Sequence, residues 1–205
     1  MALRTKTAFL FRRMCYDGEK IVTGGMTMLQ SLEFAMLDWI QLHCRGELLD
    51  VLLPLISWTC NHGELWILLA VCLLVTRKHR RLGLAIACAL VLDLLMVNLT
   101  IKPLVGRLRP FAVDPSIQLL VPPPGEASFP SGHTACSFAA AAAIWCSGYR
   151  KSGAAAFALA AVIAFSRLYL YVHYPTDVLA SVVLGIGFAF LGSWMVKKGY
   201  EIAKK

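Results

Sequence analysis

The twenty residues from Leu82 to Ile101, LGLAIACALVLDLLMVNLTI, contain a single charged side chain, that of Asp93. A helix needs about 20 apolar residues to cross the hydrocarbon core of a bilayer, so this stretch predicts one membrane span. The rest of the sequence has the same character, since 58% of the 205 residues are hydrophobic and the mean hydropathy is +0.65. Soluble domains are only roughly half apolar. The chain is therefore expected to be a membrane protein with several spans.

Apolar stretches on both sides of this segment predict the other spans. In chain order, the five expected spans cover residues 63–75, 82–101, 131–147, 153–171 and 176–196. The region before them, residues 29–60, mixes apolar and charged side chains, so we expect amphipathic helices lying at the membrane interface there, and a crossing in this region would make a sixth span. The predicted fold class is all-α, a multi-pass transmembrane helical bundle of about five to six spans with N-terminal interfacial amphipathic helices.

The domain organisation follows from these segments. Residues 1–28 form a basic N-terminal segment whose apolar stretch is too short for a signal peptide, residues 29–60 form the interfacial helices, and residues 61–205 form the transmembrane domain. Lys102-Pro103 is expected to close the span before it, because the residue preceding a proline is disfavoured in a helix. The proline-rich stretch 104–129 is neither long nor apolar enough to cross a bilayer and predicts an exposed loop.

Basic residues are distributed unevenly along the chain. The net charge is +8, and most of the excess lies at the ends of apolar segments, which favours contact with a membrane surface and not with nucleic acid. The basic connections 77–81, 150–151 and 197–205 follow alternate spans and so share one side of the membrane, which the positive-inside rule assigns to the cytoplasm. A cell-membrane protein with residues 102–131 and 166–177 on the extracytoplasmic face is predicted. With five spans, the basic N-terminus would lie on the extracytoplasmic side, which conflicts with the positive-inside rule. A membrane crossing by the interfacial region would remove this conflict.

Polar and ionisable side chains gather at the helix ends on that extracytoplasmic face. They are Lys102, Arg107, Arg109, Ser131, His133, Arg167, His173 and Asp177. Charged groups at membrane depth are costly, so they require partners or a function. Arginine forks and a lysine point charge suit a tetrahedral oxyanion, and a phosphate would satisfy them. The cysteines form no CxxC motif or Cys/His cluster, so no metal site and no cofactor are predicted.

Two short motifs carry the candidate chemistry. Pro130-Ser131-Gly132-His133 opens the third span, where free backbone N–H groups and the helix dipole favour an anion, although Ser131 could also serve only as a helix cap. His173 precedes a helix that we expect to begin at Pro175. The carboxylate of Asp177 can then accept from one ring nitrogen of His173 and leave the other as a nucleophile. On these residues alone, the alternative that Asp177 only complements the helix dipole stays open.

Three blocks of this sequence together resemble the signature of the type 2 phosphatidic acid phosphatase family. The blocks are Lys102-x6-Arg109-Pro110, Pro130-Ser131-Gly132-His133 and Ser166-Arg167-x5-His173-x3-Asp177, and the resemblance extends from about Leu65 to the fifth span. It implies that His173 attacks phosphorus, that Asp177 orients it, and that His133 protonates the leaving oxygen and then activates water. The phosphate-binding groups that it implies are Lys102, Arg109, Ser131, the amide of Gly132 and Arg167.

The function that this resemblance implies is hydrolysis of a lipid phosphate or diphosphate by an integral-membrane phosphatase, without metal or cofactor. Polyprenyl diphosphate, phosphatidylglycerol phosphate and phosphatidic acid are the candidate substrates. A vanadium-dependent haloperoxidase uses similar motifs but is soluble, and a catalytically idle membrane protein would not need an intact catalytic trio. Asp93 and Asn98 could line the site or serve packing, and Arg107 could contact phosphate or headgroups. The sequence does not predict the oligomeric state.

Overall fold

The computed structural model describes residues 27–204, which fold into helices joined by turns and loops, with no strand in this range. The helices are α2 (Met28–His43), α3 (Glu47–Trp58), α4 (Glu64–Val75), the 3₁₀ turn η1 (Arg77–His79), α5 (Arg80–Asp93), the π-helical segment η2 (Leu94–Ile101), α6 (Lys102–Val105), α7 (Pro110–Val113), α8 (Gly132–Cys146), α9 (Arg150–Tyr169) and α10 (Pro175–Ile202). The all-α class is therefore confirmed. Nearly all of the basic N-terminal segment predicted for residues 1–28 lies outside the described residues.

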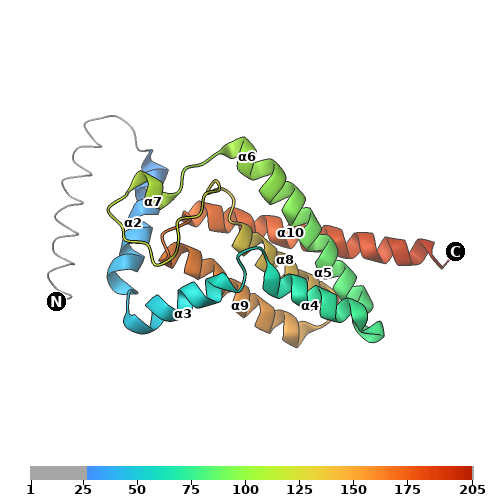
Figure 1. Ribbon diagram of the computed structural model, residues 1–205. Coiled ribbons are helices and arrows are strands. Elements are labelled where there is room, and N and C mark those ends of the chain that lie inside the picture. The colour runs from blue at the N-terminus through green and yellow to red at the C-terminus, as the bar shows by residue number, and fades with distance from the viewer. Residues whose placement is uncertain (1–26, 205) are drawn as a thin grey trace.

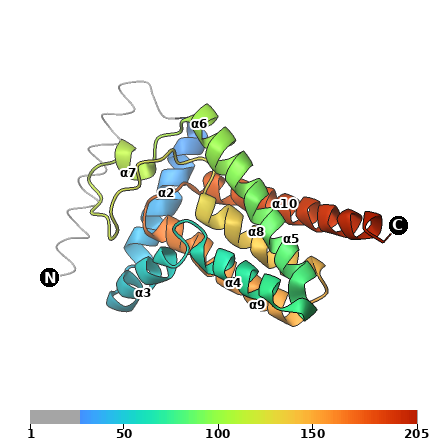
Figure 2. The same ribbon diagram turned by 45° about the vertical axis from the view of Figure 1, so that its right-hand side comes forward.

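Helix α8 forms the centre of the bundle and packs against α5, α9 and α10 (Figure 1 and Figure 2). Its alanine run 139–143 is buried throughout. Small side chains let neighbouring helices approach closely: a Cβ added at Gly185 of α10 would lie 2.4 Å from the carbonyl oxygen of Ala135. On another side, the indole N–H of Trp66 donates to the hydroxyl of Ser137 at 2.9 Å. This packing fixes the first turns of α8 against the middle of α10 and against α4.

The helix predicted for residues 82–101 is longer than expected and contains a π-helical segment. It runs from α5 through η2 into α6 and ends at Gly106, whose φ of 58° is left-handed. The prediction that Lys102-Pro103 closes the helix was wrong. Proline usually breaks a helix because it lacks an N–H. Before Pro103, however, the backbone hydrogen bonds have already changed to the π-helical pattern, since the N–H of Lys102 donates to the carbonyl of Val97, five residues back. The wider turn accommodates the proline and keeps Lys102 on a rigid helix.

Within residues 27–204, three helices are long and apolar enough to cross a bilayer: the continuous helix within residues 77–113, α9 and α10. Helix α4 has 12 residues and α8 has 15. At 1.5 Å per residue they measure about 18 and 22 Å, which is short of the roughly 30 Å hydrocarbon core. The multi-pass helical architecture is thus present, and two of the predicted spans are shorter helices of the same bundle. Helix α8 tolerates this length because its neighbours cover it.

Helices α2 and α3 lie at one end of the bundle, and α7 lies beside α2 (Figure 1). Helix α2 buries the carboxylates of Glu33 and Asp38 together with several apolar side chains, whereas Leu32, Met36 and Trp39 are exposed. An apolar outer face suits contact with lipid. The buried carboxylates, in contrast, need partners inside the protein. Helix α2 therefore presents its acidic side to the interior of the molecule.

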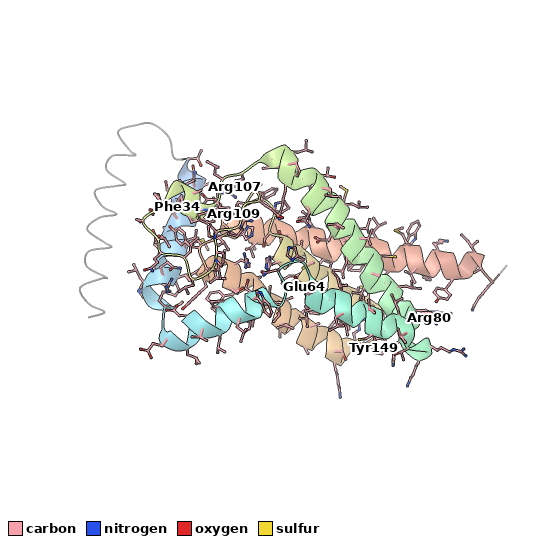
Figure 3. The ribbon with its side chains drawn as sticks, in the orientation of Figure 1. Phe34, Glu64, Arg80, Arg107, Arg109 and Tyr149 are labelled. Carbon is pink, nitrogen blue, oxygen red and sulfur yellow. The ribbon has the colours of Figure 1, made fainter. Side chains whose placement is uncertain are left out.

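The basic connections lie together at the opposite end of the bundle. Nδ1 of His79, in the turn before α5, lies 2.7 Å from the hydroxyl of Tyr149, in the turn before α9. Figure 3 shows Arg80 and Tyr149 at this end, and Arg107 with Arg109 at the other end, next to α2. The bundle thus has one basic end, and the predicted site residues lie at the other.

Candidate active site

The predicted site residues lie at the ends of several helices that meet beside α2. Lys102 is on α6, and Arg109 lies just before α7. At the start of α8 lie Ser131, Gly132 and His133. Arg167 lies in the last turns of α9, His173 lies between α9 and α10, and Asp177 lies in the first turn of α10. Gly132 and His133 are half-buried, and all the others are buried. Segments far apart in the sequence therefore contribute to one enclosed polar cluster.

The imidazole of His173 is held between Arg109 and Asp177. Its Nε2 lies 3.2 Å from Nη1 of Arg109. Its Nδ1 lies 3.5 Å from Oδ2 of Asp177, which is an electrostatic contact longer than a good hydrogen bond. Because arginine can only donate, Nε2 must be the acceptor, so the proton of the neutral ring sits on Nδ1 and faces the carboxylate. The lone pair of Nε2 is then available as a nucleophile.

Burial keeps this imidazole neutral. It lowers the pKa of His173 from 6.5 to about 3, because removal from water disfavours the charged ring; the carboxylate of Asp177 opposes this effect, and the cations of Arg109 and Arg167 add to it. A neutral ring at neutral pH is the form that a nucleophile requires.

The carboxylate of Asp177 is held by three donors in addition to its contact with His173. Oδ2 accepts from the backbone N–H of Tyr174 at 2.9 Å and from the hydroxyl of Ser128 at 2.5 Å. Oδ1 accepts from Nη1 of Arg107 at 2.5 Å. The bond from Tyr174 also caps the N-terminus of α10, which begins at Pro175 as predicted. The same carboxylate thus caps the helix and faces the histidine.

The ammonium group of Lys102 lies at the first turn of α8. A Cβ placed on Gly132 would lie 3.6 Å from Nζ of Lys102 and 3.2 Å from Oδ1 of Asn98. The missing side chain therefore leaves space between the lysine and the free backbone N–H groups of α8, and Asn98 borders that space. Lys102 also bonds the carboxylate of Glu126, and this bond lowers the pKa of Glu126. The Glu126 side chain is 67% exposed. An anionic ligand could therefore displace this carboxylate and bind Lys102 in its place.

Arg109 and Arg167 are buried, and neither forms a salt bridge with another residue of the range 27–204. Arg109 donates to the backbone carbonyls of Glu126 at 2.7 Å and Val172 at 2.9 Å. Arg167 donates to the hydroxyl of Ser57, and its Nε has no hydrogen-bond partner among the described residues. Buried donors normally find acceptors. Arg109 also donates from Nη2 to the carbonyl of Ala127 at 3.4 Å, so among the described residues its partners are uncharged oxygens and the ring of His173. Neither guanidinium charge is therefore paired with a carboxylate of the described residues, and Arg167 keeps a free donor for an anion.

His133 differs from His173 in the role of its Nε2. This atom lies 3.2 Å from Oδ1 of Asn61, in the turn between α3 and α4. With an amide oxygen as acceptor, Nε2 of His133 carries a proton. Ser131 occupies the N-cap position of α8 as predicted, but its hydroxyl makes no capping bond and accepts from Thr134 at 3.0 Å. Nε2 thus carries a lone pair in His173 and an N–H in His133.

Sequence analysis missed several residues that contact the predicted ones. They are Glu33, Ser57, Asn61, Glu126 and Ser128. Glu33 carried a weak signal, as an acid in a mostly apolar helix, whereas the others are single polar residues in helix ends or loops with no periodic pattern. Within residues 27–204, no group of three or more His, Cys, Asp or Glu side chains is arranged to hold a metal ion.

Residues 79–201 match the sequence profile of the PAP2 superfamily, and the chain belongs to this superfamily. It is 29% identical over 126 residues to an undecaprenyl-diphosphatase of Sulfolobus acidocaldarius, a match covering 62% of this chain and 61% of that protein. Undecaprenyl-diphosphatase BcrC of Bacillus subtilis is 33% identical over 150 residues, covering 71% and 74%. The solved structure of a PAP2 type phosphatidylglycerolphosphate phosphatase from Bacillus subtilis shares the fold, with a TM-score of 0.68 and 24% identity over 90% of this chain and 91% of that chain.

Proposed function

We propose that this protein is an integral-membrane lipid phosphatase that acts through a phosphohistidine. The proposal rests on the contacts of the His173 ring. Its Nε2 lies 3.2 Å from Nη1 of Arg109, and its Nδ1 faces the carboxylate of Asp177. A phosphoryl group bound between Nε2 of His173 and Arg109 would contact the nucleophile on one side and a cation on the other. Membership of the PAP2 superfamily supports the same chemistry.

The reaction proceeds in two displacements. Nε2 of His173 forms a bond to phosphorus while the bond from phosphorus to the leaving oxygen breaks, and doubly protonated His133 gives its Nε2 proton to that oxygen. The phosphorylated ring of His173 gains positive charge, which the carboxylate of Asp177 balances. Neutral His133 then removes a proton from water, the water oxygen bonds to phosphorus, and the P–N bond breaks. The products are an alcohol or a lipid monophosphate, and inorganic phosphate.

The cations supply electrostatic stabilisation in this scheme. We assign the nonbridging phosphate oxygens to Lys102, Arg109, Arg167, the hydroxyl of Ser131 and the amide of Gly132. These donors are already in place in a buried site, where they stabilise the charge of a phosphoryl transition state more than they would in water. Bound phosphate would also offset the positive charge around His133 and favour the protonated ring.

The substrate best supported is a polyprenyl diphosphate, because the relatives include undecaprenyl-diphosphatases of an archaeon and a bacterium. Phosphatidylglycerol phosphate and phosphatidic acid are the competing candidates. The domains that we propose are a phosphatase domain of residues 61–205 and interfacial helices within residues 29–60. We place the site on the extracytoplasmic face, since the basic connections lie at the opposite end of the bundle.

A phosphate-release panel tests this function. The purified protein in detergent, with EDTA present, should release phosphate from polyprenyl diphosphate faster than from phosphatidylglycerol phosphate or phosphatidic acid, and His173→Ala should abolish release from all three. Activity that disappears in EDTA and returns with Mg²⁺, or that survives His173→Ala, would contradict the mechanism.

Cysteine labelling tests the proposed topology. In a cysteine-free background, Lys78→Cys at the basic end should be protected from an impermeant reagent in intact cells, whereas Gln118→Cys at the site end should react. Labelling of Lys78→Cys with protection of Gln118→Cys would place the site in the cytoplasm.

A further inference from the structure

We propose that Arg107 is a positioning residue that holds the carboxylate of Asp177 through a second salt bridge to Glu33 on α2, and that it does not bind substrate phosphate. This inference rests on the proposed function, because it concerns the group that orients the histidine nucleophile. It also gives α2 a role in the site, although α2 lies outside the three sequence blocks and outside residues 79–201.

The guanidinium group of Arg107 is bonded to a carboxylate on each side. Nη1 donates to Oδ1 of Asp177 at 2.5 Å, and Nη2 donates to Oε2 of Glu33 at 2.5 Å. Nη1 also donates to the hydroxyl of Thr176 at 2.8 Å. Cζ lies 3.9 Å from the centroid of the Tyr174 ring, so the aromatic side chain covers one face of the cation. Each terminal nitrogen of Arg107 therefore bonds a carboxylate of the protein itself.

Glu33 connects this arginine to the start of α10. It is 2% exposed, and its Oε1 accepts from the backbone N–H of Thr176 at 3.3 Å and from the hydroxyl of the same residue. Pro175 has no N–H, so Thr176 carries one of the first free donors of the helix, and a carboxylate there is favoured by the helix dipole. Phe34, the next residue of α2, packs edge-on against Tyr174 with 5.5 Å between ring centroids. Helix α2 is thus attached to the segment that carries both His173 and Asp177.

Charge balance separates Arg107 from Arg109. The group formed by Glu33, Arg107 and Asp177 has two carboxylates and one guanidinium, so its net charge is −1 and it repels a phosphate dianion. Arg109 instead donates to carbonyl oxygens and faces Nε2 of His173. An anion entering the site gains from Arg109 and not from Arg107.

The consequence for the reaction concerns rotation of the Asp177 carboxylate. When the ring of His173 becomes positively charged, Oδ2 of Asp177 must stay directed at Nδ1. Arg107 holds the other oxygen, Oδ1, and Glu33 holds Arg107. Loss of this restraint should slow phosphohistidine formation without weakening phosphate binding, since a misplacement of about 1 Å can cost roughly 100-fold in rate.

The test compares kcat with the inhibition constant of inorganic phosphate, using the full-length protein in detergent and nitrophenyl phosphate as substrate. Arg107→Met should lower kcat by about 10- to 100-fold and change the phosphate Ki by less than about two-fold. Arg107→Lys, which keeps the charge but not the fork, should recover part of kcat. The matched control, Arg109→Met, should raise the phosphate Ki by about 10-fold or more, because it removes a charged hydrogen-bond donor.

Glu33→Gln tests the second salt bridge. It should lower kcat by several-fold in the wild-type background and have little further effect in Arg107→Met, because contacting residues of one network are not additive. An equal effect in both backgrounds would overturn the link through Glu33. A rise in phosphate Ki for Arg107→Met as large as that for Arg109→Met would make Arg107 a phosphate ligand and overturn the positioning role.

Two controls keep the outcomes separate. If Arg107→Met does not elute as a folded protein, Arg107→Lys and Glu33→Gln provide the same comparison of kcat with Ki. Turnover by His173→Ala would disprove the proposed function itself, whatever the Arg107 variants do. An inactive His173→Ala together with Arg107 variants that weaken phosphate binding would disprove only the inference.

Discussion

The polar cluster has two halves, which differ in whether their arginines are paired with carboxylates. We call Glu33, Arg107 and Asp177 the carboxylate half, and Lys102, Arg109 and Arg167 the phosphate half. In the carboxylate half, each terminal nitrogen of the arginine bonds a carboxylate. In the phosphate half, the two arginines donate to neutral oxygens, and the only carboxylate that the lysine bonds within residues 27–204 is the exposed one of Glu126. His173 lies between the halves and contacts both.

From this difference we infer that the partners of an arginine, and not its proximity to the site, indicate its role. Arg107 and Arg109 are two residues apart in the sequence; Arg109 contacts His173, and Arg107 contacts the carboxylate that faces His173. A buried cation paired with carboxylates fixes geometry, whereas a buried cation without a carboxylate retains the capacity to bind an anion. The predictions below test that division, beginning with the largest effect.

The largest expected contrast in rate comes from His133 and the leaving group. His133→Ala should slow hydrolysis of a lipid monophosphate by roughly 10²- to 10⁴-fold, because an alkoxide needs a proton to leave. The single-turnover burst of nitrophenolate should fall far less, since nitrophenolate leaves unprotonated. His79→Ala, at the basic end, is the matched control and should change neither rate. An equal loss of both rates in His133→Ala would show that His133 is not the acid.

Arg167 tests the phosphate half. Arg167→Met removes a buried donor that we assign to the phosphate oxygens, and loss of one donor to a transition state typically costs 10²- to 10³-fold in kcat. The phosphate Ki should rise in the same variant, unlike in Arg107→Met. Arg150→Met, whose guanidinium packs on the ring of Trp145 at the basic end, controls for loss of a cation. A normal phosphate Ki in Arg167→Met would remove Arg167 from the phosphate half.

The pKa of His173 predicts how stability depends on pH. The unfolded ring binds a proton below about pH 6.5, whereas the folded ring resists protonation until about pH 3, so His173 favours unfolding as the pH falls through this window. At roughly 1.4 kcal/mol per pH unit, the penalty reaches about 2 kcal/mol at pH 5. The thermal midpoint of the wild type in detergent should therefore drop relative to His173→Gln between pH 7 and pH 5. A constant difference would contradict the buried neutral ring.

Glu126 is expected to have the smallest effect. Its carboxylate competes with phosphate for Lys102, and its exposed position makes the bond weak. Glu126→Gln should therefore lower the phosphate Ki by a few-fold and leave the nitrophenolate burst nearly unchanged. Glu201→Gln, on the far end of α10, is the control carboxylate. A higher phosphate Ki in Glu126→Gln would mean that Glu126 supports the site instead of competing with phosphate.

All three residues of the phosphate half were singled out from the sequence. In the carboxylate half, Arg107 and Asp177 were singled out and Glu33 was not. Helix ends that carry spaced basic and histidine residues can be recognised because each motif lies within a few residues of a span boundary. The surroundings of Asp177 cannot be recognised in this way, since Ser128 reaches Asp177, and Glu33 reaches Arg107, only after the chain folds back. The continuation of the helix through Pro103 was missed because it depends on a π-helical turn that changes the bonding before the proline.

The most direct test of the central claim is to identify the atom that carries phosphate during turnover. His133→Ala should form the covalent intermediate from radiolabelled nitrophenyl phosphate but hydrolyse it slowly, because the base that activates water is missing. Rapid quenching into alkali, where a P–N bond survives, followed by peptide mass mapping should locate the label on His173. The label should be absent from the double variant His133→Ala/His173→Ala. A label on another residue, or product release with no covalent intermediate in single turnover, would contradict the account.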